Sequence, residues 1–304
     1  MATRKKWISE QLCVSDASFT CNLFCKYCHN PPDGGRKKIK EILAEIKKSD
    51  IDSISLEGNG EPTTNPDLIE LIEKARENGV KNIMLSTNAV NLSNKDLAFR
   101  LSELVDFITI NFPSHIKEIY NSLTRSVKYE MAIKALDNLK ESGKLYKARI
   151  FHIIVRENYK FLPELSIWLY KNYPDIGLLN FTFVRNKGRV KNNKEIVASY
   201  KEVFPYLKLA LLKTKKMGKK AVIQNMPLCV LNGVEGFSFE YHRWLRGDKA
   251  LESGIDAPGK IAACLKCNLR KGCCGARKDY LKIYGHSELK TSNLNLRDIK
   301  PERF

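Results

Sequence analysis

The chain has 304 residues, enough for one or two domains with a core that needs no disulfides. Hydrophobic residues make up 43% and charged residues 28%, which excludes wholesale disorder, and no run of eighteen apolar residues predicts a transmembrane helix. The formal net charge is +18, and residues 1–10 are basic without the apolar centre of a secretory signal, so we expect a cytoplasmic protein.

Short apolar segments predict six strands, and segments with helical spacing separate them. The expected strands are 11–17, 51–57, 82–87, 107–111, 148–155 and 178–184. The expected helices are 37–48, 66–78, 94–104, 127–142, 159–172 and 194–216. In the second helix we expect Asn65 as the N-cap, Pro66 as the first helical residue and Gly79 at the end.

This alternation of strands and helices predicts an α/β fold built on a parallel sheet. Six strand–helix pairs are too few for a closed eight-stranded barrel, so we predict a partial (β/α)6 barrel of the TIM type or a doubly wound sheet. In both, the site lies on the loops that follow the strands. Because the alternation stops near residue 220, we predict a barrel domain over 1–220 and a small cysteine-rich module over 221–304.

Basic residues are concentrated in the segment 185–220, which holds twelve Lys and Arg residues against two acidic ones. A positive segment of this kind attracts nucleic acid, nucleotides or acidic peptides. A lysine-rich helix that only faces solvent gives the same pattern. Both interpretations stay open.

Nine cysteines fall into two groups about 200 residues apart, which favours metal sites over disulfides in a reducing compartment. The first group is a C-x3-C-x2-C motif formed by Cys21, Cys25 and Cys28, directly after the first predicted strand. Three thiolates can hold a four-iron cluster that leaves one iron open to an outside ligand. The alternative is a zinc ion bound by these cysteines and His29.

With Tyr27 before its last cysteine, this motif resembles the signature of the radical S-adenosylmethionine (SAM) superfamily. The resemblance continues at successive strand ends. Segment 59–62 is similar to the family's Gly-Gly-Glu-Pro motif with Asn59 in place of the first glycine, and segment 86–89 is similar to Ser-Thr-Asn-Gly with alanine last. Asn111 stands where serine is frequent, and segment 181–189 resembles a Gly-Arg segment of members with an auxiliary cluster.

The resemblance implies a [4Fe–4S] cluster on the three cysteines that binds SAM at its open iron. Reduction would cleave SAM to methionine and a 5′-deoxyadenosyl radical, which removes a hydrogen atom from the substrate. The carboxylate of Glu61 would accept a hydrogen bond from the SAM amino group. The other residues expected to bind SAM are Tyr27, Gly60, Asn88, Asn111 and Arg189. Local structural roles are the alternative for Glu61, Asn88, Asn111 and Arg189.

The second group is Cys264, Cys267 and Cys273, with Cys274 adjacent and Cys229 upstream. Its spacing resembles the C-terminal auxiliary-cluster modules of radical SAM enzymes, of the twitch or shortened SPASM type. That implies a second [4Fe–4S] cluster on Cys229, Cys264, Cys267 and either Cys273 or Cys274, of which we predict Cys273. The alternative is a structural four-cysteine zinc site, which beside the basic segment would indicate nucleic-acid binding.

We therefore expect a radical SAM enzyme that modifies a peptide or protein by crosslinking, epimerisation or oxidation, with reduced ferredoxin or flavodoxin as electron donor. A small-molecule substrate is also compatible, whereas no membrane partner is expected. No leader-peptide-binding domain is expected before the first strand, so a partner protein would supply it. The alternatives are a radical SAM enzyme acting on a nucleotide or RNA, and a zinc-bearing nucleic-acid-binding protein without activity.

Overall fold

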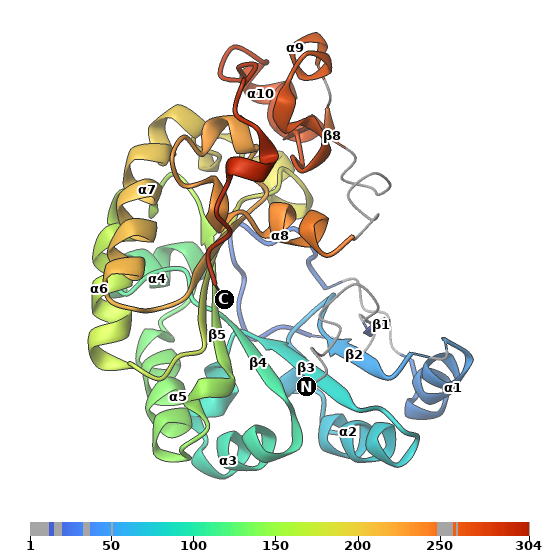
Figure 1. Ribbon diagram of the computed structural model, residues 1–304. Helices are drawn as coiled ribbons and strands as arrows, with labels where there is room; N and C mark the ends of the chain where they lie inside the picture. The colour runs from blue at the N-terminus through green and yellow to red at the C-terminus, as the bar shows by residue number, and fades with distance from the viewer. Residues whose placement is uncertain are drawn as a thin grey trace.

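The computed structural model describes residues 12–14, 20–32, 37–49, 51–247, 258–259 and 261–303. Seven parallel strands form one sheet in which spatial order follows chain order (Figure 1). They are β1 (Leu12–Val14), β2 (Ser53–Leu56), β3 (Asn82–Thr87), β4 (Phe107–Asn111), β5 (Ala148–Ile154), β6 (Leu178–Phe183) and β7 (Ala221–Gln224). Among the described residues β7 does not pair with β1, so the barrel stays open. This confirms the predicted partial barrel.

Helices cover the outer face of the sheet and bury its apolar side chains against their own (Figure 1). Those that follow strands β1 to β6 are α1 (Ile39–Ser49), α2 (Leu68–Glu77), α3 (Lys95–Leu104), α4 (Lys117–Thr124), α5 (Tyr129–Glu141), α6 (Leu162–Asn172) and α7 (Tyr200–Lys216). None of the described helices is long and apolar enough to span a bilayer. The inner face of the sheet is left to form a cavity.

The element boundaries follow the sequence prediction closely in the middle of the chain. Strands β3 and β4 match it residue for residue, whereas most of the expected strand 11–17 lies outside the described residues. The prediction of six strands is wrong because it missed β7. That strand has four residues, near the lower limit of strand length, and follows a lysine-rich turn that hides its apolar pattern. Helix α4 was also missed, because it has only eight residues.

The start of α2 also differs from the prediction. Pro66 is not its first residue, since the helix begins at Leu68 with Asp67 as its N-cap residue. Asn65 instead accepts a hydrogen bond at its side-chain oxygen from the Asp67 N–H, 2.9 Å away, in a turn before the helix. The expected C-terminal glycine is correct: Gly79 has a φ of 89°, which is readily available only to glycine.

The C-terminal segment packs on the barrel at the end of β6. It contains α8 (Phe239–Leu245), β8 (Pro258–Gly259), α9 (Ala262–Leu265), β9 (Ala276–Arg277) and α10 (Lys278–Tyr284). The ring of Tyr280 in α10 stacks on that of Tyr200 in α7 with 3.8 Å between centroids, and Asp279 accepts a hydrogen bond from the Asn186 N–H at 2.7 Å. The division at residue 220 stays a prediction, with β7 directly after it.

Candidate active site

The inner face of the sheet encloses a cavity of about 650 Å³. Alternate residues of the strands point into it, and the loop that follows β1 closes one side. Every residue predicted to bind the first cluster or SAM lines this cavity: Cys21, Cys25, Tyr27, Cys28, Gly60, Glu61, Asn88, Asn111 and Arg189. The fold therefore brings together residues that are up to 168 positions apart in the sequence.

Two neighbouring segments hold the loop that carries Cys21, Cys25 and Cys28, the cysteine loop, in place. The N–H groups of Phe24 and Lys26 donate to the carbonyls of Thr124 and Leu123 at the end of α4, at 3.1 and 2.9 Å. On the other side, the Arg189 N–H donates to the Cys28 carbonyl at 2.9 Å. These backbone contacts fix the loop independently of any bound metal.

Gly188 makes this approach of the two segments possible. Its φ is 60°, and a Cβ atom there would lie 2.5 Å from the Cys28 carbonyl oxygen and 2.6 Å from the His29 carbonyl carbon. The positive φ and the lack of room for a Cβ atom both require glycine at this position. The sequence showed a glycine before Arg189 but gave no signal that it touches the cysteine loop, which lies 160 residues upstream.

The three thiols of the loop are held in their neutral form by their surroundings. Burial raises the pKa of Cys25 to about 12 and also raises those of Cys21 and Cys28. The positive charge of Arg189 opposes this at Cys25 and Cys28. A metal that binds here must displace these protons, so metal binding releases protons from the loop.

Glu61 is buried and receives four hydrogen bonds from its own chain. Its Oε1 accepts from the N–H of Thr63 and from the hydroxyls of Thr63 and Thr87. Its Oε2 accepts one bond, from the Asn88 N–H at 2.6 Å. A carboxylate has about four acceptor positions over its two oxygens, so Oε2 keeps capacity for one further donor. The structural role and the expected ligand role are therefore compatible.

Asn88 and Asn111 connect the strand ends to the cysteine loop. The Asn88 side-chain amide donates to the Asn22 side-chain oxygen at 2.6 Å and, more weakly, to the Cys21 sulfur at 3.8 Å. The Asn111 amide donates to the Tyr27 hydroxyl at 2.9 Å. The Oδ1 atom of Asn111 is buried and makes no hydrogen bond within the described part of the chain. It is an acceptor beside the cavity that a bound ligand could satisfy.

Arg189 has a structural role that the sequence did not reveal. Its guanidinium lies 3.5 Å from the centre of the Phe24 ring, and its Nη1 donates to the Cys25 carbonyl at 3.4 Å. Arg189 therefore braces the cysteine loop as well as lining the cavity. Arg185 and Lys187 also line the cavity, so the basic segment is not confined to an outer helix.

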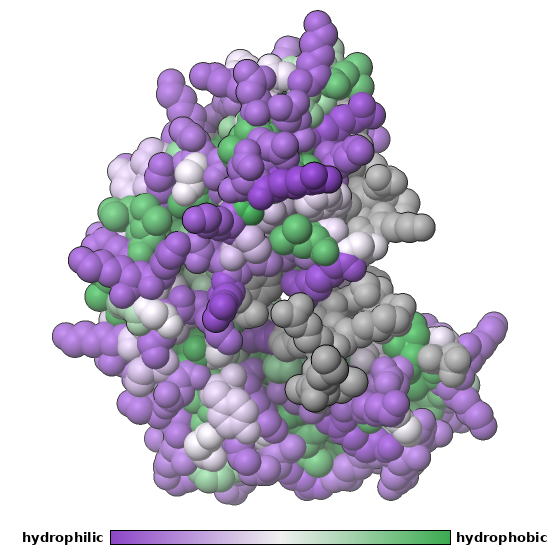
Figure 2. Space-filling view, viewed as in Figure 1, coloured by the Kyte–Doolittle hydropathy of each residue, from purple (hydrophilic) through white to green (hydrophobic). Residues whose placement is uncertain are grey.

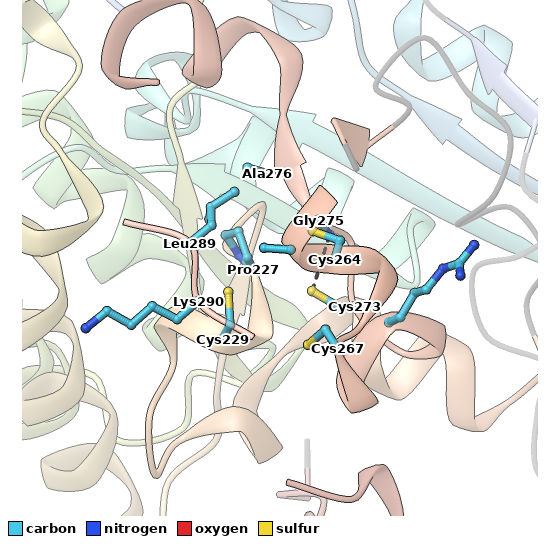
Figure 3. A pocket seen from close by; sticks show the side chains of 11 residues that line it. Pro227, Cys229, Cys264, Cys267, Cys273, Gly275, Ala276, Leu289 and Lys290 are labelled. Atoms are coloured by element: carbon cyan, nitrogen blue, oxygen red, sulfur yellow. Dashed lines mark hydrogen bonds between the residues drawn. The ribbon is translucent and has the colours of Figure 1, made fainter. Parts of the chain in front are cut away.

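The four cysteines predicted to hold the second cluster line one small pocket of about 20 Å³. Figure 3 shows the side chains of Cys229, Cys264, Cys267 and Cys273 around this space, together with Pro227, Leu289 and Lys290. Backbone N–H groups donate to two of the sulfurs: Leu228 and Gly275 to Cys273, both at 3.3 Å, and Ser292 to Cys267 at 3.4 Å. Such bonds stabilise thiolates and tune bound iron–sulfur clusters.

Cys274 does not line this pocket. Its thiol donates to the Met226 carbonyl at 3.4 Å. The Gly275 and Leu228 N–H groups donate to the Cys273 sulfur instead, which favours its thiolate form. The geometry thus separates two adjacent cysteines that the sequence left as alternatives.

Comparison with known proteins identifies one domain of the chain. Residues 17–160 match the model of the radical SAM superfamily. The chain carries a radical SAM domain. Mycofactocin maturase MftC of Mycobacterium tuberculosis is 27% identical over 194 residues, which cover 61% of this chain and 48% of that protein. A protein named probable GTP 3′,8-cyclase of Thermoplasma volcanium is 30% identical over 174 residues, covering 55% and 52%. The match spans about half the length of these relatives.

Solved structures share the fold of this chain. SuiB of Streptococcus suis bound to S-adenosylmethionine superposes with a TM-score of 0.63 at 18% identity, over 96% of this chain and 78% of that one. The enzyme anSMEcpe with bound AdoMet gives a TM-score of 0.59 at 18% identity, over 86% and 68%. At this identity the likeness concerns the fold, and it extends beyond the residues that match the family model.

The residues present fit the cofactors of the superfamily, a [4Fe–4S] cluster and SAM. Among the described residues, no three His, Cys, Asp or Glu side chains converge as the ligands of one metal ion do. The spare acceptor positions of Glu61 and Asn111 suit a ligand rich in donors, as an ammonium group and ribose hydroxyls are.

Proposed function

We propose that this protein is a radical SAM enzyme that modifies a peptide, with Cys21, Cys25 and Cys28 as ligands of the SAM-binding cluster. The observation that carries the proposal is the convergence of these cysteines, Glu61 and Asn111 on one cavity of about 650 Å³. When bound, the cluster and SAM supply a one-electron cleavage whose product removes a hydrogen atom from the substrate. A reduced ferredoxin or flavodoxin is the proposed electron donor.

The chain's own residues have three tasks in this reaction. Glu61 and Asn111 offer oxygen acceptors that orient the amino group and a hydroxyl of SAM. The Asn88 amide and the Arg189 guanidinium place partial and full positive charge near the cluster thiolates. The strands and the cysteine loop enclose the cavity, which limits the water that could quench a reactive intermediate.

The four cysteines of the C-terminal segment are the proposed ligands of an auxiliary [4Fe–4S] cluster. They line one pocket, and two of them accept backbone hydrogen bonds as bound thiolates do. Two hydrogen bonds join this segment to the barrel. The Asn186 N–H, after β6, donates to Asp279, and the Tyr200 N–H, at the start of α7, donates to the Tyr280 hydroxyl. The second cluster would therefore sit near the barrel opening.

The similarity to MftC supports a peptide substrate, since that relative is named as a maturase, and so does the fold shared with SuiB, which was solved with the precursor peptide SuiA. The similarity to proteins named GTP 3′,8-cyclase supports a nucleotide as the second candidate. Cations that line the cavity are compatible with both, because they suit acidic peptides and phosphates alike.

Anaerobic incubation with SAM, dithionite and a deuterium-labelled extract of the source organism tests the proposal. We expect 5′-deoxyadenosine to form and to acquire deuterium, as measured by mass spectrometry, and the labelled donor to fractionate with peptides. The control is the triple variant Cys21→Ala/Cys25→Ala/Cys28→Ala, which should form none. Protein that contains stoichiometric zinc and lacks absorbance near about 400 nm would contradict the proposal.

A further inference from the structure

A row of four polar side chains crosses the floor of the cavity. In the sheet register Ser86 of β3 pairs with Thr109 of β4, and Thr109 pairs with Arg149 of β5. Glu57, directly after β2, extends the row, and its Oε2 accepts from the Ser86 hydroxyl at 3.3 Å. All four residues line the cavity. The row thus has a carboxylate at one end, a guanidinium at the other and two hydroxyls between them.

The guanidinium of Arg149 is held in a defined plane. It lies 3.9 Å from the centre of the Phe107 ring, as stacking of a guanidinium on an aromatic face requires. Burial lowers the pKa of Arg149 to about 10, which leaves the side chain charged at neutral pH. A planar fork of donors held in this way suits a carboxylate, which can accept two parallel hydrogen bonds.

The charges around the cavity favour an anionic guest. Among the described residues its lining contains the cations Arg149, Arg185, Lys187 and Arg189 against the anions Glu57 and Glu61. Both carboxylates are engaged by their own chain: Glu61 by four hydrogen bonds, and Glu57 by the Cys13 thiol at 3.0 Å and the Ser86 hydroxyl. An excess of cations in a partly enclosed cavity attracts anions.

A ligand bound to Arg149 would extend to the cysteine loop. It precedes Phe151 by two residues, and Phe151 pairs in register with Asn111, whose amide contacts Tyr27 of that loop. Two residues of a strand correspond to about 7 Å. If one group of a substrate binds Arg149, other atoms of that substrate therefore lie beside Asn111.

We propose that Arg149 anchors a substrate carboxylate in the cavity, with the hydroxyls of Ser86 and Thr109 as further hydrogen-bonding partners along the floor. The inference rests on the proposed function and adds a substrate class to it: a peptide whose reacting residue is close to a carboxylate. That carboxylate has two possible sources, an acidic side chain or a free C-terminus, and the chemistry of recognition is the same for both.

Three matched peptides test this inference by calorimetry on the reconstituted, SAM-loaded protein: acetyl-Gly-Glu-Gly-amide, acetyl-Gly-Gln-Gly as free acid, and the neutral acetyl-Gly-Gln-Gly-amide. We expect at least one anionic peptide to bind about tenfold to a hundredfold more tightly than the neutral one. Preference for the first identifies a side-chain carboxylate, and preference for the second a C-terminus. Arg149→Gln should abolish the preference, and Arg149→Lys should retain part of it.

Arg100→Gln, on the outer helix α3, is the matched control and should keep the full preference. Equal affinity of the wild type for all three peptides, no binding of the anionic peptides up to about 10 mM, or a preference that survives in Arg149→Gln overturns the inference. Cleavage of SAM by the wild type is measured in the same preparation. If SAM is cleaved without a carboxylate preference, only the anchor is wrong, whereas no cleavage contradicts the proposed function itself.

Discussion

Glu61 illustrates what a single residue in a motif can and cannot reveal. The resemblance of segment 59–62 to the Gly-Gly-Glu-Pro motif of the radical SAM superfamily implied a ligand role. The structure adds that the same carboxylate joins the ends of β2 and β3 through Thr63, Thr87 and Asn88. No sequence pattern shows this, because Thr87 and Asn88 follow Glu61 by 26 and 27 residues and become its neighbours only through strand pairing.

We predict that Glu61→Gln weakens SAM binding by about ten- to a hundredfold, the loss of one charge-assisted hydrogen bond. The amide also loses acceptor positions for the donors that surround it, so some stability is lost as well. Thr63→Val is the matched control, because it removes the hydroxyl bond to Glu61 without altering the cavity lining. Equilibrium binding of SAM and iron content are the measurements. An unchanged SAM affinity would leave Glu61 with only the structural role.

Gly188 gives a second prediction at this scale. In Gly188→Ala the new methyl group meets the Cys28 and His29 backbone at 2.5–2.6 Å, and the residue must keep a φ of 60°. We expect the cysteine loop to shift and iron to fall from about eight to about four atoms per chain, with the second cluster retained. Gly218→Ala is the control: its φ is 69° but no atom lies within 4 Å, so it should lose about 1–2 kcal/mol of stability and no iron.

At the scale of elements, the sequence predicted best where a strand is long and apolar. Strands β3 to β6 and helices α2 and α5 were found within a few residues because periodicity and end signals agree there. Strand β7 was missed because the lysine-rich turn before it hides its apolar pattern, and helix α4 was missed because its eight residues make only about two turns. The auxiliary site is an intermediate case. Spacing singled out its cysteines, but only their placement in space separates Cys273 from Cys274.

We predict that Cys273→Ala removes the auxiliary cluster and that Cys274→Ala does not. Cys273 lines the pocket and accepts two backbone N–H groups, whereas the Cys274 thiol donates to the Met226 carbonyl. The two variants serve as controls for each other, because each removes one thiol from adjacent positions. Iron and acid-labile sulfide per chain are measured after anaerobic reconstitution. Loss of half the iron in Cys274→Ala, with full iron in Cys273→Ala, would reverse the assignment.

At the scale of the whole molecule, the net charge of +18 is the feature that the sequence could not interpret. The structure divides the basic segment 185–220 into two parts with different surroundings. Arg185, Lys187 and Arg189 line the cavity, where they act on whatever enters it. The lysines at the end of α7 face outward, and two of them have local partners: Lys215 with Glu302 at 2.6 Å and Lys219 with the Pro174 carbonyl at 2.8 Å.

This division predicts how the protein responds to RNA. Outward lysines with local partners form a general positive surface, so binding of RNA should be non-specific and fall steeply with salt as counterions are released. We therefore expect little RNA to be retained at moderate salt in a pull-down with and without nuclease. Two variants of equal charge are compared with the wild type. The first changes the lysines around the end of α7 to Gln: Lys213, Lys215, Lys216, Lys219 and Lys220. The second changes five exposed lysines elsewhere on the barrel to Gln: Lys40, Lys47, Lys48, Lys74 and Lys81.

Because non-specific binding depends on total charge, both variants should lose low-salt RNA binding to a similar extent. Reductive cleavage of SAM in the absence of substrate should be the same in both variants as in the wild type, since none of the ten lysines lines the cavity. A discrete RNA that survives moderate salt and is lost only in the α7 variant would contradict the peptide proposal. The lysines at the end of α7 would then be a specific nucleic-acid site, and modification of RNA would become the better account of this radical SAM protein.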